Sequence, residues 1–264
     1  MNSLAKKFYE IGGESNIQEV LSLGDNPKIH WDEISEKVPD LPRSWFELSR
    51  VPSQIRIEFL SDLWFSSLPF NPLAHSSFIR FFSRLDDVAI LVVKRESETQ
   101  VEMVYSLSDN RSFFRGFPPA TEEDIRVFKN EINENLPRDY LSFLRLHNGF
   151  GKLSEQGILR IEEIPKERSV VKELLMNRDK IIKWKGRSVD PDALIPFYED
   201  YGLNSFQCFF SDWYPGSEMG NVYLSGINYT ISDIADRNIW SEQLGFPSFL
   251  EWLAFYLEGM NVSF

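Results

Sequence analysis

The nine residues GFPPATEED, at positions 116 to 124, divide the chain into two parts. The two adjacent prolines hold the backbone extended and interrupt any helix or central strand that reaches them. Thr121 then supplies a helix N-cap, and the three acids that follow complement the positive end of a helix dipole. The sequence therefore predicts a boundary here, between a region of residues 1–117 and a domain of residues 118–264.

The region before this boundary combines helices with one strand pair. The segment 44–70 spaces Ile55, Phe59 and Leu63 as on one side of a helix, with Leu60 and Trp64 beside them, and ends near the prolines of LPFNP. A shorter helix follows around SSFIRFFSRL. The runs DVAILVVKR and QVEMVYSLS, separated by the polar ESET, predict a β-hairpin. The first 50 residues predict only short helical pieces and loops.

The region after the boundary begins with two helices and continues mainly with strands. A helix carries Ile125, Phe128 and Ile132 on one face, and the segment LPRDYLSFLRLHNGFG predicts a second. Short strands are expected at GILRI, ALIPF, FQCFF, NVYL and YTIS, interrupted by a polar helix at about 167–184. The apolar PSFLEWLAFYLEG predicts a closing helix. Helices and strands do not alternate regularly, so the predicted fold class is α+β.

The segment LPRDYLSFLRLHNGFG ends in glycines followed by a lysine, which raises the question of a phosphate-binding loop. Such a loop needs a glycine separated by four residues from its Gly-Lys pair and a hydroxyl after the pair, but Leu146 and Leu153 occupy those positions. Pro137 instead suits the start of a helix, and Asn148-Gly149 suits its end. The segment is therefore interpreted as a helix.

In order along the chain, PPATEEDIRVFKNEI, LPRDYLSFLRLHNGFG, LIPFYEDYGLNSFQCFF, GNVYLSG and GFPSFLEWLAFYL resemble the SMI1/KNR4 family, also called the SUKH superfamily. The resemblance covers residues 118 to about 258. It implies a mixed or antiparallel sheet flanked by helices, to which residues 1–117 add a helical and β-hairpin extension. It also implies a non-enzymatic role, either as an immunity protein that neutralises a toxin or as a scaffold-like regulator.

Composition limits the partners. The net charge of -12 and the pI of about 4.8 argue against nucleic acid and favour a basic protein, such as a toxin or a regulatory protein. No apolar run is long enough to span a membrane, and the N-terminus lacks the apolar core of a secretion signal. The single cysteine cannot form an internal disulfide. A cytoplasmic protein without membrane contact is expected.

Residues with catalytic potential lack the neighbours that catalysis needs. Cys208 lies among phenylalanines, and His30, His75 and His147 lack metal-ligand spacing. Ser217 is one residue out of place for a nucleophile elbow. The basic stretch RDKIIKWKGR has no second basic or aromatic platform beside it and is interpreted as solvated surface. We expect no catalytic residue, cofactor or metal.

The stretch FFSDWYPGSEMGNVY places large aromatic residues around a Pro-Gly turn. Aromatic residues on loops are typical of protein-binding hot spots, but they can equally close the core against residues 1–117. Both interpretations remain open. The candidate partner-binding residues are Tyr198, Glu199, Asp200, Tyr201, Asp212, Trp213, Tyr214, Glu218 and Tyr223.

Two functions follow from these observations. The first is a non-enzymatic protein-binding module that uses the aromatic residues and nearby acids of segment 197–223. The second is an enzyme or small-ligand-binding protein with a cleft between residues 1–117 and the C-terminal domain, which a deep pocket with converging polar groups would favour.

Overall fold

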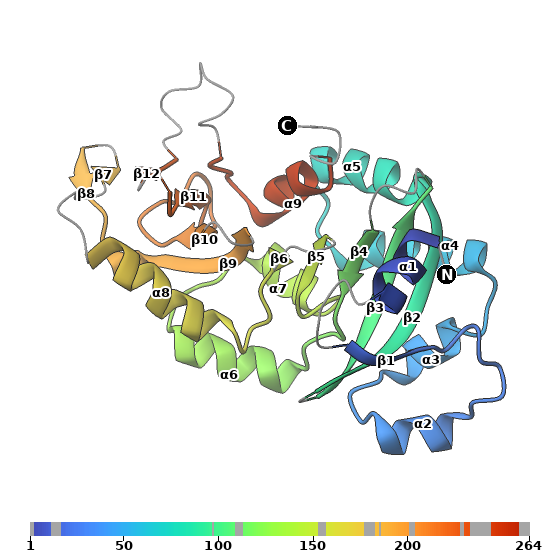
Figure 1. Ribbon diagram of the computed structural model, residues 1–264. Coiled ribbons are helices and arrows are strands. Elements are labelled where there is room, and N and C mark those ends of the chain that lie inside the picture. Colours follow the sequence, from blue (N-terminus) through green and yellow to red (C-terminus); the bar gives the residue numbers. More distant parts are fainter. Residues whose placement is uncertain are drawn as a thin grey trace. The chain divides into compact units, whose positions relative to one another are not determined.

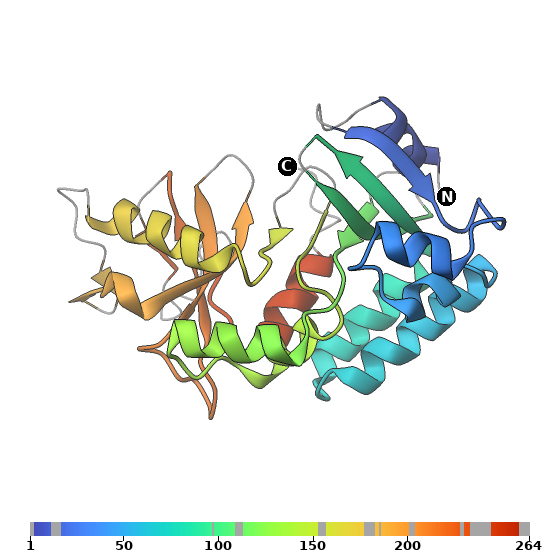
Figure 2. The same ribbon diagram turned by 90° about the horizontal axis from the view of Figure 1, so that it is seen from below.

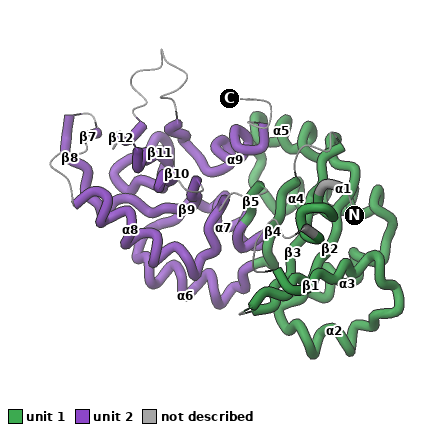
Figure 3. Tube along the Cα trace, in the orientation of Figure 1, with its two compact units in different colours: residues 1–119, 150–154 green, residues 120–149, 155–264 purple. Residues whose placement is uncertain are grey.

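The chain forms two compact units (Figure 3). Unit 1 contains residues 1–119 and 150–154, and unit 2 contains residues 120–149 and 155–264. Residues 150–154 therefore belong to unit 1, although in sequence they follow the first two helices of the predicted C-terminal domain. The computed structural model describes residues 3–11, 17–96, 98–108, 113–152, 157–176, 183–184, 186–200, 204–227, 230–232 and 244–258.

Each unit combines helices with an antiparallel sheet, so the α+β prediction is confirmed (Figures 1 and 2). The elements of unit 1 are α1 (Ser3–Ile11), β1 (Ile17–Ser22), α2 (Trp31–Lys37), α3 (Arg43–Leu48), α4 (Ser53–Ser67), α5 (Pro72–Ser83), β2 (Leu85–Arg95), β3 (Thr99–Leu107), β4 (Phe113–Gly116) and β5 (Phe150–Lys152). Its strands are ordered β1-β2-β3-β4-β5.

The predicted hairpin of unit 1 is the pair β2 and β3, in which Val92 lies opposite Val101. Strand β2 is buried along nearly its whole length, which explains its continuous apolar sequence. On one face of the sheet, Trp64 of α4 contacts the rings of Tyr105 and Phe150 at 6.3 and 5.7 Å. Strand β1, which the sequence did not predict, pairs with the outer edge of β2.

Helix α1 packs on the other face of this sheet through Ala5 and Tyr9, which join an apolar cluster on β2, β3 and β4. The fully buried carboxylate of Glu102 lies there. It accepts a hydrogen bond from the Tyr9 hydroxyl, and it pairs with the Arg95 guanidinium at 2.7 Å. A buried carboxylate is costly unless it is paired and hydrogen-bonded. The hydrogen bond from Tyr9 to Glu102 therefore fixes α1 on the sheet.

Unit 2 is built around strands ordered β6-β9-β10-β11-β12. Its elements are α6 (Glu122–Ile132), α7 (Arg138–Leu144), β6 (Gly157–Ile158), α8 (Ile164–Met176), β7 (Lys183–Trp184), β8 (Arg187–Ser188), a 3₁₀ turn (Pro191–Ala193), β9 (Leu194–Asp200), β10 (Ser205–Phe210), β11 (Asn221–Ser225), β12 (Thr230–Ile231) and α9 (Phe249–Glu258).

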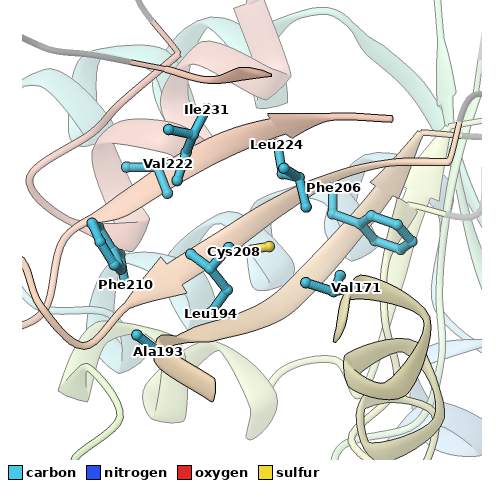
Figure 4. Close-up of a cluster of buried hydrophobic side chains, with 9 residues drawn as sticks. All are labelled: Val171, Ala193, Leu194, Phe206, Cys208, Phe210, Val222, Leu224 and Ile231. Atoms are coloured by element: carbon cyan, nitrogen blue, oxygen red, sulfur yellow. The ribbon is translucent and has the colours of Figure 1, made fainter. Parts of the chain in front are cut away.

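The core of unit 2 lies on both faces of this sheet. On one face, Val171 of α8 packs with Phe206, Cys208 and neighbouring side chains of the strands (Figure 4). On the other face, the rings of Phe197 and Phe209 stack 4.3 Å apart and contact Phe249 of α9. Tyr140 of α7 joins them, since its ring lies 4.9 Å from that of Phe209.

The helix starts of unit 2 follow the predictions more closely than the helix ends. Thr121 caps α6 and forms a reciprocal capping box with Asp124. Helix α7 begins directly after Pro137 but ends at Leu144, before the predicted Asn148-Gly149 stop. Asn148 instead accepts a hydrogen bond from the backbone N–H of Ile161 and donates one to Glu162. Asn148 thus fixes the position of residues 161 and 162, beyond the end of α7.

Helix α8 spans Ile164–Met176, so it begins three residues before the predicted polar helix at 167–184. Lys183 and Trp184, predicted as its last residues, form β7, which pairs with β8 in a separate small hairpin. Arg178, Lys180 and Lys185 of the basic stretch lie outside the described residues.

Candidate functional site

The predicted aromatic stretch forms the connection between β10 and β11, residues 211–220, which we call the aromatic hairpin. Its base is closed by backbone hydrogen bonds: Trp213 N–H donates to the Phe210 carbonyl, and Gly220 N–H donates to the Trp213 carbonyl, both at 2.9 Å. The Trp213 ring packs against the apolar cluster that Val171 of α8 forms with the strands. A β-carbon on Gly220 would lie 2.5 Å from this ring, so only glycine fits there. The base of the hairpin is therefore part of the core.

The tip of the aromatic hairpin is a surface. The side chain of Tyr214 is 48% exposed, and Asp212 and residues 215–217 are also exposed. Partial burial and the nearby carboxylate of Glu134 raise the pKa of the Tyr214 hydroxyl. The tip therefore presents an uncharged aromatic ring with carboxylates close to it.

Glu218 connects the aromatic hairpin to the start of α7. Its carboxylate accepts a hydrogen bond of 2.9 Å from the backbone N–H of Arg138. The Arg138 guanidinium lies 3.7 Å from the other carboxylate oxygen but is 89% exposed, so this ion pair is weak. The backbone hydrogen bond fixes the second half of the hairpin.

The other described binding residues lie on the strands beside β10: Tyr223 on β11 and Tyr198 on β9 are both opposite Gln207. Tyr198, Glu199 and Asp200 belong to strand β9, where Asp200 lies opposite Ser205, the first residue of β10. The aromatic hairpin follows Phe210, the last residue of β10. Ser205 and Phe210 are five residue steps apart along the strand, or about 17 Å. The predicted residues therefore form two groups, one on the aromatic hairpin and one on the strands β9 and β11.

The aromatic rings of this second group are half-buried. The Tyr198 ring lies 5.2 Å from that of Trp252 and 5.3 Å from that of Tyr256, both on α9. Burial raises the pKa of Tyr223, while a hydrogen bond with Ser205 opposes the change. Tyr201 lies outside the described residues. The Tyr198 ring therefore packs on α9 of unit 2, whereas the alternative interpretation placed these rings against residues 1–117.

Glu199 lies on the face of the sheet that α8 covers. Its pKa is raised, first by burial and then by the carboxylate of Glu167, while Lys166 acts in the opposite direction. Lys166 pairs with Glu167 at 2.9 Å. Within the part of the chain that the structure describes, no group of three or more His, Cys, Asp or Glu residues has a metal-binding arrangement.

Three residues with catalytic potential in the sequence are Cys208, His147 and Ser217. Cys208 is fully buried in the cluster of Figure 4, and burial raises the pKa of its thiol, which disfavours the reactive thiolate. His147 is buried just beyond α7. Ser217 is exposed at the hairpin tip. The predicted structural role of Cys208 agrees with this burial.

Sequence reasoning missed Glu134, which lies between α6 and α7, and Arg138, which is the first residue of α7. They are about 80 residues from the hairpin that they meet, as the Arg138–Glu218 contact shows. No local spacing signals such a contact, because it depends on how α7 packs against the sheet. The sequence indicated the acids Asp212 and Glu218 of the hairpin itself, but not the carboxylate of Glu134 near Tyr214.

Unit 2 thus defines a class of protein: an α+β domain with an antiparallel sheet between α8 on one face and α7 and α9 on the other. The family model described as SMI1 / KNR4 family (SUKH-1) matches residues 119–254, and the chain belongs to this family. Comparison with curated proteins gives no match. None of the described helices is both long and apolar enough to cross a membrane.

Proposed function

We propose that this protein is a non-enzymatic protein-binding module that holds a basic protein partner on the aromatic hairpin. The observation that carries this proposal is the half-exposed ring of Tyr214 on a hairpin whose base is anchored in the core by Trp213. A ring held in this way loses little conformational freedom on binding, and tyrosine is enriched among hot-spot residues.

The surroundings of Tyr214 favour a cationic partner. Asp212 is exposed on the same hairpin, Glu134 acts electrostatically on the tyrosine, and Glu218 is held at the start of α7. The net charge of -12 attracts a basic protein at longer range and would raise the association rate. Toxin neutralisation and scaffolding, the two roles that the family resemblance implies, would both use such a surface.

The second group of predicted residues is a weaker candidate, since Tyr198 packs against α9. The buried Cys208 with its raised thiol pKa supports a role without thiol chemistry. An unpaired cysteine also suits a reducing compartment, so we propose a cytoplasmic location.

The test compares Tyr214→Ala with Phe255→Ala in the full chain. Both side chains are 48% exposed aromatics of unit 2, but Phe255 lies on α9, outside the hairpin. Each tagged protein is incubated with native cytosol, and the bound proteins are quantified by mass spectrometry. We expect a basic protein to be retained by the wild type and by Phe255→Ala, and to be reduced at least about tenfold by Tyr214→Ala.

A second variant, Asp212→Lys, tests the electrostatic part of the proposal. With the purified partner, the association rate should fall and its dependence on salt should weaken, while the dissociation rate changes less. Equal retention of the partner by Tyr214→Ala and the wild type would contradict the proposal. So would a retained partner that is acidic.

A further inference from the structure

The outer side of the α4–α5 helix pair in unit 1 carries a groove of about 380 Å³. It is lined by Ile57, Glu58 and Asp62 of α4 and by Ile79, Phe82 and Ser83 of α5. Ile57 and Phe82 are buried and form its apolar floor, whereas Ile79 is 60% exposed and forms part of its wall.

Further exposed apolar side chains lie on α4, outside the residues that line the groove. Ile55 and Phe59 of α4 are 50% and 51% exposed. At about 100° per residue, both lie on the outward crest of α4, next to Asp62. Clustered apolar side chains of this size on a protein surface mark interaction sites more often than isolated ones do.

The charges of the groove have one sign. Glu58 and Asp62 are the charged residues among those that line it. Glu58 accepts a hydrogen bond of 2.9 Å from the Gln54 amide, and among the described residues neither carboxylate forms an ion pair. Arg80 of α5 does not line the groove, and its guanidinium donates a hydrogen bond of 3.1 Å to the Ser77 hydroxyl.

We propose that this groove binds a cationic amphipathic helix of a partner protein. Apolar side chains of the helix would cover Ile79 and Phe82, and a Lys or Arg would lie between Glu58 and Asp62. The charge complementarity selects a basic segment, because an acidic one would face two like charges next to an apolar floor.

The geometry favours a helix over an extended strand. The walls are helices whose backbone groups are already paired, so a bound strand would find no backbone partners there. A helix satisfies its own backbone and can place its ridges in the groove between two others. The 15 residues of α4 extend about 22 Å, which matches four turns of a bound helix.

This inference does not rest on the aromatic hairpin, because every residue that carries it belongs to unit 1. Loss of binding at one surface leaves the other proposal standing. The experiment therefore uses the full chain and a synthetic probe: a fluorescein-labelled helical peptide of Leu, Ala and Lys, with Leu along one face. A matched peptide has Glu in place of Lys, and a scrambled one has the same composition without the apolar face.

Binding is measured by fluorescence anisotropy for the wild type, Ile79→Ser, Leu73→Ser and the double variant Glu58→Gln/Asp62→Asn. Leu73 is the matched control, since it is 65% exposed on α5 but does not line the groove. We expect the Lys peptide to bind the wild type and Leu73→Ser equally, and to bind the other two variants at least about tenfold more weakly. The Glu peptide and the scrambled peptide should not bind. Circular dichroism of each variant verifies that the fold is intact.

Three results would overturn the inference. Equal affinity for the Lys and Glu peptides would show that charge does not select the partner. Equal effects of Ile79→Ser and Leu73→Ser would show that the peptide does not bind in the groove. The third is a concentration-dependent dimer of the free protein, seen by sedimentation and abolished by Ile79→Ser. That result would assign the groove to a second copy of this chain.

Discussion

At the scale of single residues, Asp139 joins two helices of unit 2. The side chain lies at the start of α7 and is buried. One carboxylate oxygen accepts a hydrogen bond from the Tyr140 N–H at 2.9 Å, and the other accepts one from the Leu250 N–H of α9 at 3.0 Å. Burial raises the pKa of this carboxyl from 3.8 to about 6.

This raised pKa predicts a pH-dependent stability. The folded state binds the Asp139 proton more tightly than the unfolded state does, so this stabilisation is fully present below about pH 4 and is lost as the pH rises through about 6. Asp139→Asn does not titrate, but its amide nitrogen cannot accept the hydrogen bond that one of the two carboxylate oxygens accepts. We expect the variant to be about 1–3 kcal/mol less stable than the wild type near pH 4. By pH 7 this difference should shift in favour of the variant by up to about 3 kcal/mol.

Urea denaturation across this pH range measures the difference. Asp212→Asn serves as the control because its carboxylate is exposed, and its stability should follow that of the wild type at every pH. A constant difference between Asp139→Asn and the wild type from pH 4 to pH 7 would contradict a raised pKa for Asp139.

At the scale of elements, α4 shows why periodicity can predict a helix without predicting its buried face. The sequence places Ile55, Phe59 and Leu63 along one side, but Ile55 and Phe59 are half-exposed. The buried face carries Ile57, Leu60 and Trp64. Both stripes are apolar, so their spacing alone does not decide between them.

Paired substitutions on α4 test this orientation. Leu60→Ala should lower the free energy of unfolding by about 2–5 kcal/mol, because it leaves a cavity against the sheet of unit 1. Phe59→Ala removes a side chain that is 51% exposed, and we expect a change within about 0.5 kcal/mol. Urea denaturation followed by far-ultraviolet circular dichroism measures both. Equal losses would place Phe59 in the core.

Other elements were predictable where a local signal sufficed. The hairpin of β2 and β3 follows from two apolar runs around a polar turn, and the start of α6 follows from its capping box. Strand β1 was missed because IQEVLS is short and only partly buried, and its pairing with β2 is a contact between distant segments. The aromatic hairpin was found from composition, but the division of its residues between core and surface required the packing of Trp213.

At the scale of the whole molecule, unit 1 includes one segment of chain that follows the first two helices of unit 2 in sequence. Residues 150–154 leave unit 2 and supply β5, which pairs with β4 of unit 1. Phe150 is fully buried there. Its ring stacks 5.2 Å from that of Phe114 and lies edge-on to that of Trp64 at 5.7 Å. Unit 1 is therefore incomplete when the chain is cut at its first boundary, between Pro119 and Ala120.

This arrangement predicts different behaviour for the two fragments. Residues 120–264 contain every described strand and helix of unit 2, and we expect this fragment to unfold cooperatively. Residues 1–119 lack Phe150 and expose the edge of β4, which should cost at least about 3–5 kcal/mol and favour aggregation. Urea denaturation and sedimentation of both fragments measure this difference.

Phe150→Ala in the full chain is the control. In hydrogen-exchange measurements, this substitution should weaken the protection of the amides of β3 and β4 but leave that of β10 unchanged. Cooperative unfolding of residues 1–119 at the midpoint that unit 1 has in the full chain would show that β5 is dispensable.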